Sequence, residues 1–263
     1  MLAVAAACIV IVARSGTAGP TGLPANSVGL IDPAGEWVGA PVRVGSPTGL
    51  AFGGGSVWAV NSTEGTLSRI NPATHAVVGQ FSVGSAPTAV TVTDQDVWIT
   101  NSGDSTVSRI NAAANKAVQT IRVGNLPIAI ASGPSGVWVA NEGDDTVSRI
   151  NPLTGKVTRT VQVGGRPHGI AVGRDAVWVA NSGDGTVTRI DPATGQPGGP
   201  VPVGSGPAAI AATPTAVWVA NSLDLTVSKI DPATSRVRTV TVAIRQPAGI
   251  RPARRAIRRG ARS

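Results

Sequence analysis

Acidic and amide side chains recur in short Gly-containing segments, at spacings that could serve cation binding. NSGD at 101–104 and 181–184 and NEGD at 141–144 each place an Asn three residues before an Asp. Their oxygens are ligands that calcium prefers. The same residues also favour tight turns, because Asn and Asp bond nearby backbone N–H groups and Gly adopts positive φ. Recurrence in successive units favours the turns, and we predict no metal site. The candidate ligand contacts on these turns are Asp104, Asp144 and Asp184.

Histidine is the other residue type here that could do acid–base chemistry. His168 follows Pro167 at the start of a predicted strand, beside Arg166, on the face where the Asp-bearing turns are expected. His75, the second of two histidines, is expected on the opposite face. A general base needs catalytic partners within hydrogen-bond reach. The sequence shows no Ser/His/Asp arrangement, phosphate-binding loop or Cys/His metal spacing. We therefore predict that Arg166 and His168 bind a ligand, with no catalytic residue and no cofactor.

A 40-residue repeat positions these residues. Trp recurs at that interval five times, and Asn, Thr, Ile and Pro columns keep the same period. Columns held in phase at such a period indicate a repeat architecture. The Trp column is Trp58, Trp98, Trp138, Trp178 and Trp218, and the Pro column is Pro47, Pro87, Pro127, Pro167, Pro207 and Pro247.

Each unit reads as four short strands. Residues 167–204 contain HGIAVG, AVWVAN, TVTRID and a last strand ending in PVPVG, separated by turn residues. Consecutive apolar residues in VWVA suit a strand covered on both faces. Pro200 and Pro202 place the fourth strand at a sheet edge, because proline cannot donate a ladder hydrogen bond. Four strands per unit of this length are typical of a propeller blade, so we predict an all-β β-propeller.

The number of blades follows from the incomplete units at both ends. Five full units begin at Pro47 and its successors, whereas residues 27–32 and 37–44 supply only the third and fourth strands of another. Pro247 to Arg251 can supply its first strand, but residues 257–261 do not resemble a second strand. We predict six blades closed by both termini, with a truncated seven-bladed ring or an imperfectly closed ring as alternatives.

A cationic residue recurs near the end of each third strand. An anion-binding track is one interpretation of such a column. We favour the simpler one, a solvated edge of a partly exposed strand. The column consists of Arg69, Arg109, Arg149, Arg189 and Lys229.

The N-terminal segment is apolar from Leu2 to Ala13, too short to span a bilayer as a helix. No basic residue precedes it, so it resembles only part of an export signal. We assign 1–14 to a partial membrane anchor or export signal, 15–25 to a flexible linker and 26–250 to the propeller. The protein is thus expected outside the cytoplasm, at the cell surface or secreted, and anchored to a membrane through its N-terminus.

Positive charge is concentrated at the other end of the chain. Seven arginines between 245 and 263, with no acidic residue among them, carry all but one of the eight net charges. A basic tail at 251–263 could contact nucleic acid through its phosphates. It lacks interleaved aromatic residues and a recognised fold, so we predict no nucleic-acid partner and keep tail-mediated binding as an alternative.

The repeat resembles the YVTN (YncE-like) β-propeller repeat family. The resemblance lies in VWVANEGDDTVSRINPLTG at 137–155 and VWVANSGDGTVTRIDPATG at 177–195, and extends from Asn26 to about Ile250. It implies a fold and an extracytoplasmic location, and no reaction. We expect a binding module for a protein or small-molecule partner. The alternative enzyme is a lyase of the streptogramin-lyase type with His168 as its base.

Overall fold

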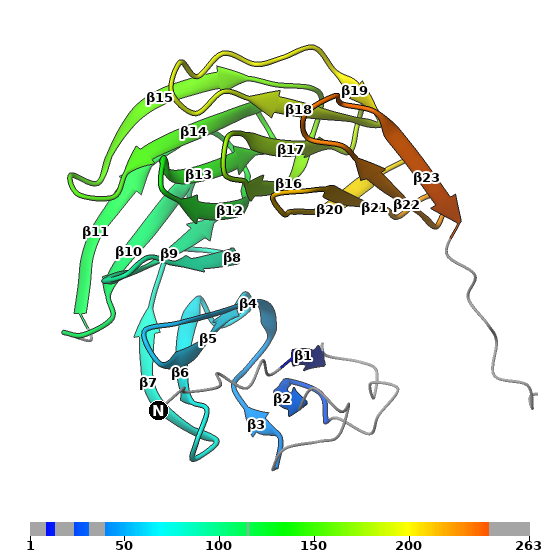
Figure 1. The fold of residues 1–263 in the computed structure, drawn as a ribbon. Coiled ribbons are helices and arrows are strands. Elements are labelled where there is room, and N and C mark those ends of the chain that lie inside the picture. Colours follow the sequence, from blue (N-terminus) through cyan, green and yellow to red (C-terminus); the bar gives the residue numbers. More distant parts are fainter. Residues whose placement is uncertain (1–8, 14–23, 32–39, 115, 242–263) are drawn as a thin grey trace, which may run out of the picture.

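The computed structural model describes residues 9–13, 24–31, 40–114 and 116–241. All regular secondary structure in these ranges is β-strand. Five four-stranded antiparallel sheets and one three-stranded sheet follow one another around a central axis, as Figure 1 shows. The predicted all-β propeller of four-stranded blades is confirmed, and its six sheets are consistent with six blades.

In each full blade the strands lie side by side in chain order, with the first strand innermost. The first strands are β4 (Pro47–Gly53), β8 (Pro87–Val92), β12 (Pro127–Gly133), β16 (Pro167–Val172) and β20 (Pro207–Ala212). The second strands are β5 (Ser56–Asn61), β9 (Asp96–Asn101), β13 (Gly136–Asn141), β17 (Val177–Asn181) and β21 (Val217–Asn221).

The outer half of each blade holds the remaining two strands. The third strands are β6 (Thr66–Asn71), β10 (Thr106–Asn111), β14 (Thr146–Asn151), β18 (Thr186–Ile190) and β22 (Thr226–Ile230). The fourth strands are β7 (Ala76–Ser82), β11 (Lys116–Arg122), β15 (Lys156–Gln162), β19 (Val201–Pro202) and β23 (Val237–Thr241). The fourth strand is an edge strand in every blade, which explains how β19 accommodates proline.

The Trp column forms the contacts between blades. Trp138 is fully buried and packs with Ile170, Val177 and Val179 of the next blade. Trp58, Trp98 and Trp178 belong to equivalent clusters with the blade that follows each of them. Successive blades therefore bury both faces of every internal sheet, as the consecutive apolar residues of VWVA predicted.

The polar columns stabilise the inside of each blade. The Asn141 side-chain amide donates to Thr146 Oγ1 and Ser148 Oγ, both at 3.0 Å, and the other four full blades repeat this pair of bonds. Ser148 is buried, as are its equivalents. The third strand is therefore more buried than its alternating sequence predicted, because the polar half of the pattern is hydrogen-bonded within the sheet.

The three-stranded sheet has the pairing of a partial blade. β2 (Ser27–Ile31) and β3 (Val42–Arg43) pair as third and fourth strands, as predicted. β1 (Ile9–Ala13) pairs with β2 in the register that second strands have elsewhere: Ala13 faces Ser27 as Asn61 faces Thr66. The first strand expected at 247–251 lies outside the described residues.

β1 falls inside the segment that the sequence assigned to an anchor or export signal. An apolar run of this length suits a buried strand as well as part of a membrane segment, and the assignment of 1–14 remains a prediction. In the described part of the chain, no helix is long and apolar enough to cross a membrane. The linker at 15–25 lies largely outside the described residues, and the basic tail wholly so.

Candidate functional site

The innermost strands enclose a central cavity of about 750 Å³. Each first strand contributes two or three residues near its beginning, so the cavity opens toward the face of the disc where these strands start. We call this the mouth face; it carries the turns between second and third strands. The lining residues are Thr48, Gly49, Leu50, Thr88, Ala89, Val90, Ile128, Ala129, His168, Gly169, Ile170, Ala208, Ala209 and Ile210.

His168 is the only titratable side chain in this lining. It follows Pro167, and the residue after each proline occupies the same place in its own blade. In the other full blades this place is held by Thr48, Thr88, Ile128 and Ala208. The sequence therefore correctly predicted that His168 lies on an inner strand, at the end of that strand where the Asp turns are found.

Glu142 connects His168 to Arg166 across two blades. Arg166 Nε and one terminal nitrogen donate to Glu142 Oε1 at 3.1 and 2.8 Å. His168 Nδ1 lies 3.9 Å from Glu142 Oε2. The Glu142 side chain is 15% exposed, against 70% for Arg166 and 40% for His168. A largely buried carboxylate thus holds the exposed Arg166 guanidinium by hydrogen bonds and lies close to the partly exposed His168 ring at the cavity mouth.

Glu142 interrupts a column of the repeat, whereas Arg166 and His168 stand in two columns that vary from blade to blade. Four full blades have Ser where the third blade has Glu142, and Ser102, Ser182 and Ser222 use the hydroxyl to bond a backbone carbonyl. Glu142 reaches the neighbouring blade instead. Sequence analysis missed Glu142, although its exception to the Ser column was a visible signal.

The three predicted aspartates make structural hydrogen bonds, and their contact with a ligand stays a prediction. Asp104, Asp144 and Asp184 accept hydrogen bonds of 2.6–2.7 Å from the backbone N–H of Ser85, Asn125 and Gly165. Each carboxylate thereby binds the segment that leads into the first strand of the same blade. In the described part of the chain, no group of His, Cys, Asp or Glu could hold a metal ion.

The segment that connects the fourth strand of one blade to the first strand of the next must approach these carboxylates very closely. A Cβ at Gly84 would lie 2.6 Å from both Asn101 Cγ and Asp104 Oδ2, and Gly124, Gly164 and Gly204 are equally close to their own Asn and Asp. The recurring Gly therefore follows from the Asp contact. Among the described residues, Asp145 rather than Asp144 is hydrogen-bonded to Arg166, accepting its backbone N–H at 2.7 Å.

The side chains of the cationic column pack on the tryptophan rings. Each cation lies over the Trp ring of its own blade, 5.0 to 5.9 Å from the ring centroid. The Arg109 side chain is only 15% exposed and pairs with Asp96 at 2.6 Å. The prediction of a solvated edge is wrong for the four arginines, because residues paired across two strands bring each guanidinium onto an indole face. Lys229 in the fifth blade is exposed.

The fold and this site define a β-propeller with one irregular cluster at its central opening. Residues 123–201 match the model of the YNCE-like beta-propeller family, which confirms the YncE-like resemblance over those residues. A search of the curated proteins gave no match.

Solved structures agree on the fold. The computationally designed Ika8 protein is 19% identical with a TM-score of 0.67, covering 83% of this chain and 72% of its own. The Pan2 WD40 domain of Neurospora crassa is 13% identical (TM-score 0.69; 83% and 74% covered). A functionally unknown protein from Desulfotomaculum acetoxidans is 16% identical (TM-score 0.69; 82% and 76%). Identities this low establish a common fold and nothing further.

Proposed function

We propose that this chain is an extracytoplasmic β-propeller that binds a protein or small-molecule partner at the mouth of its central cavity. The observation that carries the proposal is the meeting of Glu142, Arg166 and His168. Glu142 is the exception in a column of Ser, Arg166 and His168 are the only ionisable residues of their columns in the five full blades, and the three come from two adjacent blades. Stability alone gives no reason for this, since blades without the exceptions have the same fold.

The chemistry of the cluster suits recognition of polar groups. Arg166 keeps most of its surface in solvent while Glu142 fixes its orientation, and His168 can donate or accept within the cavity lining. The apolar residues of the inner strands provide contact area around them. Such a mixture of apolar lining and few converging polar groups is typical of ligand sites.

The repeat itself supplies replacements that the fold tolerates. Glu142→Ser, Arg166→Ala and His168→Thr each install the residue found at the equivalent place in the second blade, where Ala86 has the same positive φ as Arg166. We expect the triple variant to fold normally and to lose partner capture, measured by affinity chromatography of surface extracts followed by biolayer interferometry.

His75→Ala is the matched control, because His75 lies in the turn between β6 and β7 at the other end of the strands. It should leave capture unchanged. Equal capture by the triple variant and the unaltered protein would place recognition elsewhere and remove the proposal for this site.

The His168–Glu142 pair also favours one enzymatic alternative, a lyase of the streptogramin-lyase type with His168 as general base. A carboxylate beside an imidazole can orient it for proton transfer. This function requires turnover in metal-containing buffer that His168→Ala abolishes, and activity retained by that variant would exclude it. Nucleic-acid binding through 251–263 concerns residues outside those described.

A further inference from the structure

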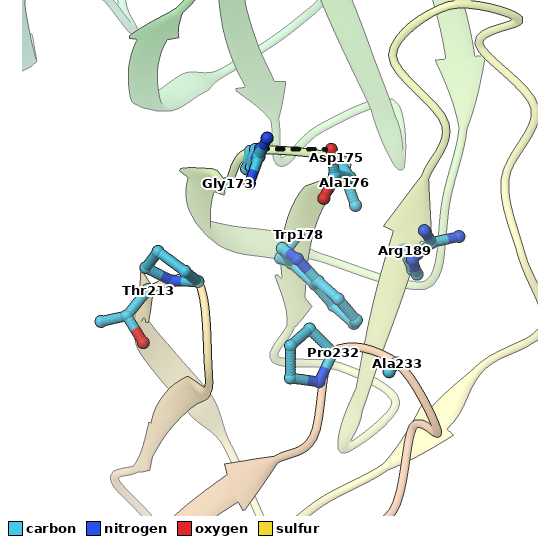
Figure 2. Close-up of a pocket in the computed structure, with 10 residues that line it drawn as sticks. Gly173, Asp175, Ala176, Trp178, Arg189, Thr213, Pro232 and Ala233 are labelled. Carbon is cyan, nitrogen blue, oxygen red and sulfur yellow. Dashed lines mark ion pairs between the residues drawn. The ribbon is translucent and has the colours of Figure 1, made fainter.

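A second cavity lies between the fourth and fifth blades, on the opposite face from the mouth. Its volume is about 250 Å³. The turn from Gly173 to Ala176, the Trp178 ring and Arg189 come from the fourth blade, whereas Thr213 and Pro232 come from the fifth (Figure 2). The Trp178 ring lies in the middle of this group (Figure 2).

In the preceding blades the protein satisfies the equivalent indole N–H. Trp58, Trp98 and Trp138 donate through Nε1 to Gly53 O, Thr93 Oγ1 and Ser135 Oγ at 3.0–3.2 Å. Within the described residues, no group accepts a hydrogen bond from Trp178 Nε1. Gly173 stands where Thr93 stands in the second blade and offers no hydroxyl, and its carbonyl does not accept as that of Gly53 does in the first blade.

The Arg side chain over each Trp ring shows the same difference between the fourth blade and the blades before it. Arg69, Arg109 and Arg149 donate through Nε to Ser56 Oγ, Asp96 Oδ2 and Ser135 O at 2.8–3.0 Å. Arg189 Nε is buried and has no acceptor among the described residues. Ala176 replaces Ser56 and Asp96. A buried donor without a partner is costly, and Arg189 Nε is such a donor. Trp178 Nε1 is a second donor beside the same cavity without an acceptor among the described residues.

The third blade shows that one small group can accept from both donors. Ser135 receives the Trp138 indole N–H on its hydroxyl and the Arg149 Nε–H on its carbonyl. In the fourth blade Asp175 holds this place, but its side chain is 83% exposed and lies 4.0 Å from Arg174 Nε. A ligand with two oxygens could therefore take over what Ser135 does in the third blade.

The charges around the cavity leave Arg189 as its cation. Asp175 and Arg174 offset each other at the rim. The Thr194 backbone N–H lowers the pKa of Asp191 most, and Asp191 is close enough for the Arg189 charge to contribute. Its Oδ1 accepts the backbone N–H groups of Ala193 and Thr194 at 2.8 and 3.1 Å and no hydrogen bond from Arg189 Nε. An incoming anion would find a guanidinium whose Nε–H faces no competing acceptor.

We propose that this cavity binds a carboxylate, whose two oxygens accept from Trp178 Nε1 and Arg189 Nε. The carboxylate belongs either to a small free acid or to an acidic side chain of a partner. The volume admits a group of that size rather than a large ligand. The site is independent of the mouth face, and variants of Glu142, Arg166 and His168 should not affect it.

The experiment follows the Trp indole N–H signals of the full chain by ¹⁵N NMR during titration with sodium acetate, at constant ionic strength kept with sodium chloride. We expect a saturable shift of the Trp178 signal, assigned through Trp178→Phe, and none of the Trp138 signal. Arg189→Lys should weaken acetate binding at least about tenfold, since it removes one charge-assisted hydrogen bond.

We expect Arg189→Lys to preserve the fold, because the fifth blade carries Lys229 over Trp218 at the same place. Arg149→Lys is the matched control and should leave acetate affinity unchanged. Equal shifts of Trp178 and Trp138, a response to chloride alone, or equal affinity in Arg189→Lys would overturn the proposal. A pentaglutamate peptide that binds tenfold tighter than acetate identifies a protein source, and equal or weaker binding identifies a free acid.

Discussion

At the residue scale, the aspartates of this chain serve its turns and connections. Asp224 accepts from the Thr226 hydroxyl at 2.7 Å and the Ser205 backbone N–H at 2.7 Å, and these bonds lower its pKa. The backbone N–H groups of Thr194 and Thr234 lower the pKa values of Asp191 and Asp231 in the same way. Hydrogen bonds that favour the ionised form stabilise the fold only while the carboxylate is charged.

The consequence is a loss of stability in acid. A carboxylate with a lowered folded-state pKa contributes fully above its unfolded-state pKa, near 3.8 for Asp224, and the contribution disappears as pH falls through the lowered value. We expect Asp224→Asn to unfold at lower urea concentration than the unaltered protein at pH 6, with a smaller difference at pH 3. Asp94→Asn removes an exposed carboxylate without a described hydrogen bond and serves as control. A difference that is the same at both pH values would contradict this account.

At the scale of elements, the blade is the unit that recurs and the Trp contact is what joins one blade to the next. Trp138 is fully buried against the fourth blade, whereas Trp218 in the fifth blade is 44% exposed. The difference has a simple cause: among the described residues, no sheet covers the outward face of β20 to β23. The same Trp position of the repeat thus has different environments in the third and fifth blades.

This difference predicts unequal effects of the same substitution. Trp138→Ala should lower the free energy of unfolding by about 3–5 kcal/mol, because it leaves a cavity between two blades. Trp218→Ala should cost much less, since a large part of its ring is in solvent. Urea denaturation followed by far-UV circular dichroism measures both. Comparable losses would mean that Trp218 is covered in solution.

At the scale of the whole molecule, the sheets form a disc around one axis rather than an extended array. The first strands pack in the order β4, β8, β12, β16 and β20, and β1 contacts β4. The partial blade β1–β3 packs against the first full blade through Val28, Val42 and Val57. The two chemically distinctive places, the mouth cluster and the cavity beside Trp178, lie on opposite faces of this disc.

Small-angle X-ray scattering tests this arrangement. A compact domain of 263 residues should have a radius of gyration of about 18 Å, against about 57 Å for an unfolded chain of that length. We expect a value close to the former, raised slightly by segments outside the disc. A pair-distance distribution with a long tail, typical of a linear array, would be incompatible with the propeller.

The repeat made much of this fold readable from the residues alone. The Trp and Pro columns locate the second and first strands, the Asn and Thr columns flank the turn between the second and third strands, and proline places the fourth strand at the edge. These features depend on contacts within one blade, between residues close in sequence, so the same local pattern gives the same local structure each time. The position of His168 at the start of an inner strand followed for this reason.

Contacts between blades were decided only by the tertiary structure. Glu142 lies close to Arg166 and His168 because the segment leading into the fourth blade passes beside the turn between β13 and β14 of the third blade. The 40-residue period does not predict which side chains make contact between these two blades. Arg189 and Trp178 keep unused donors because the small residues Gly173 and Ala176 lie opposite them. The sequence alone determined the scaffold, since local hydrogen bonding repeats with the columns. The sites required the assembled structure, since they arise where unlike residues of adjacent blades are packed together.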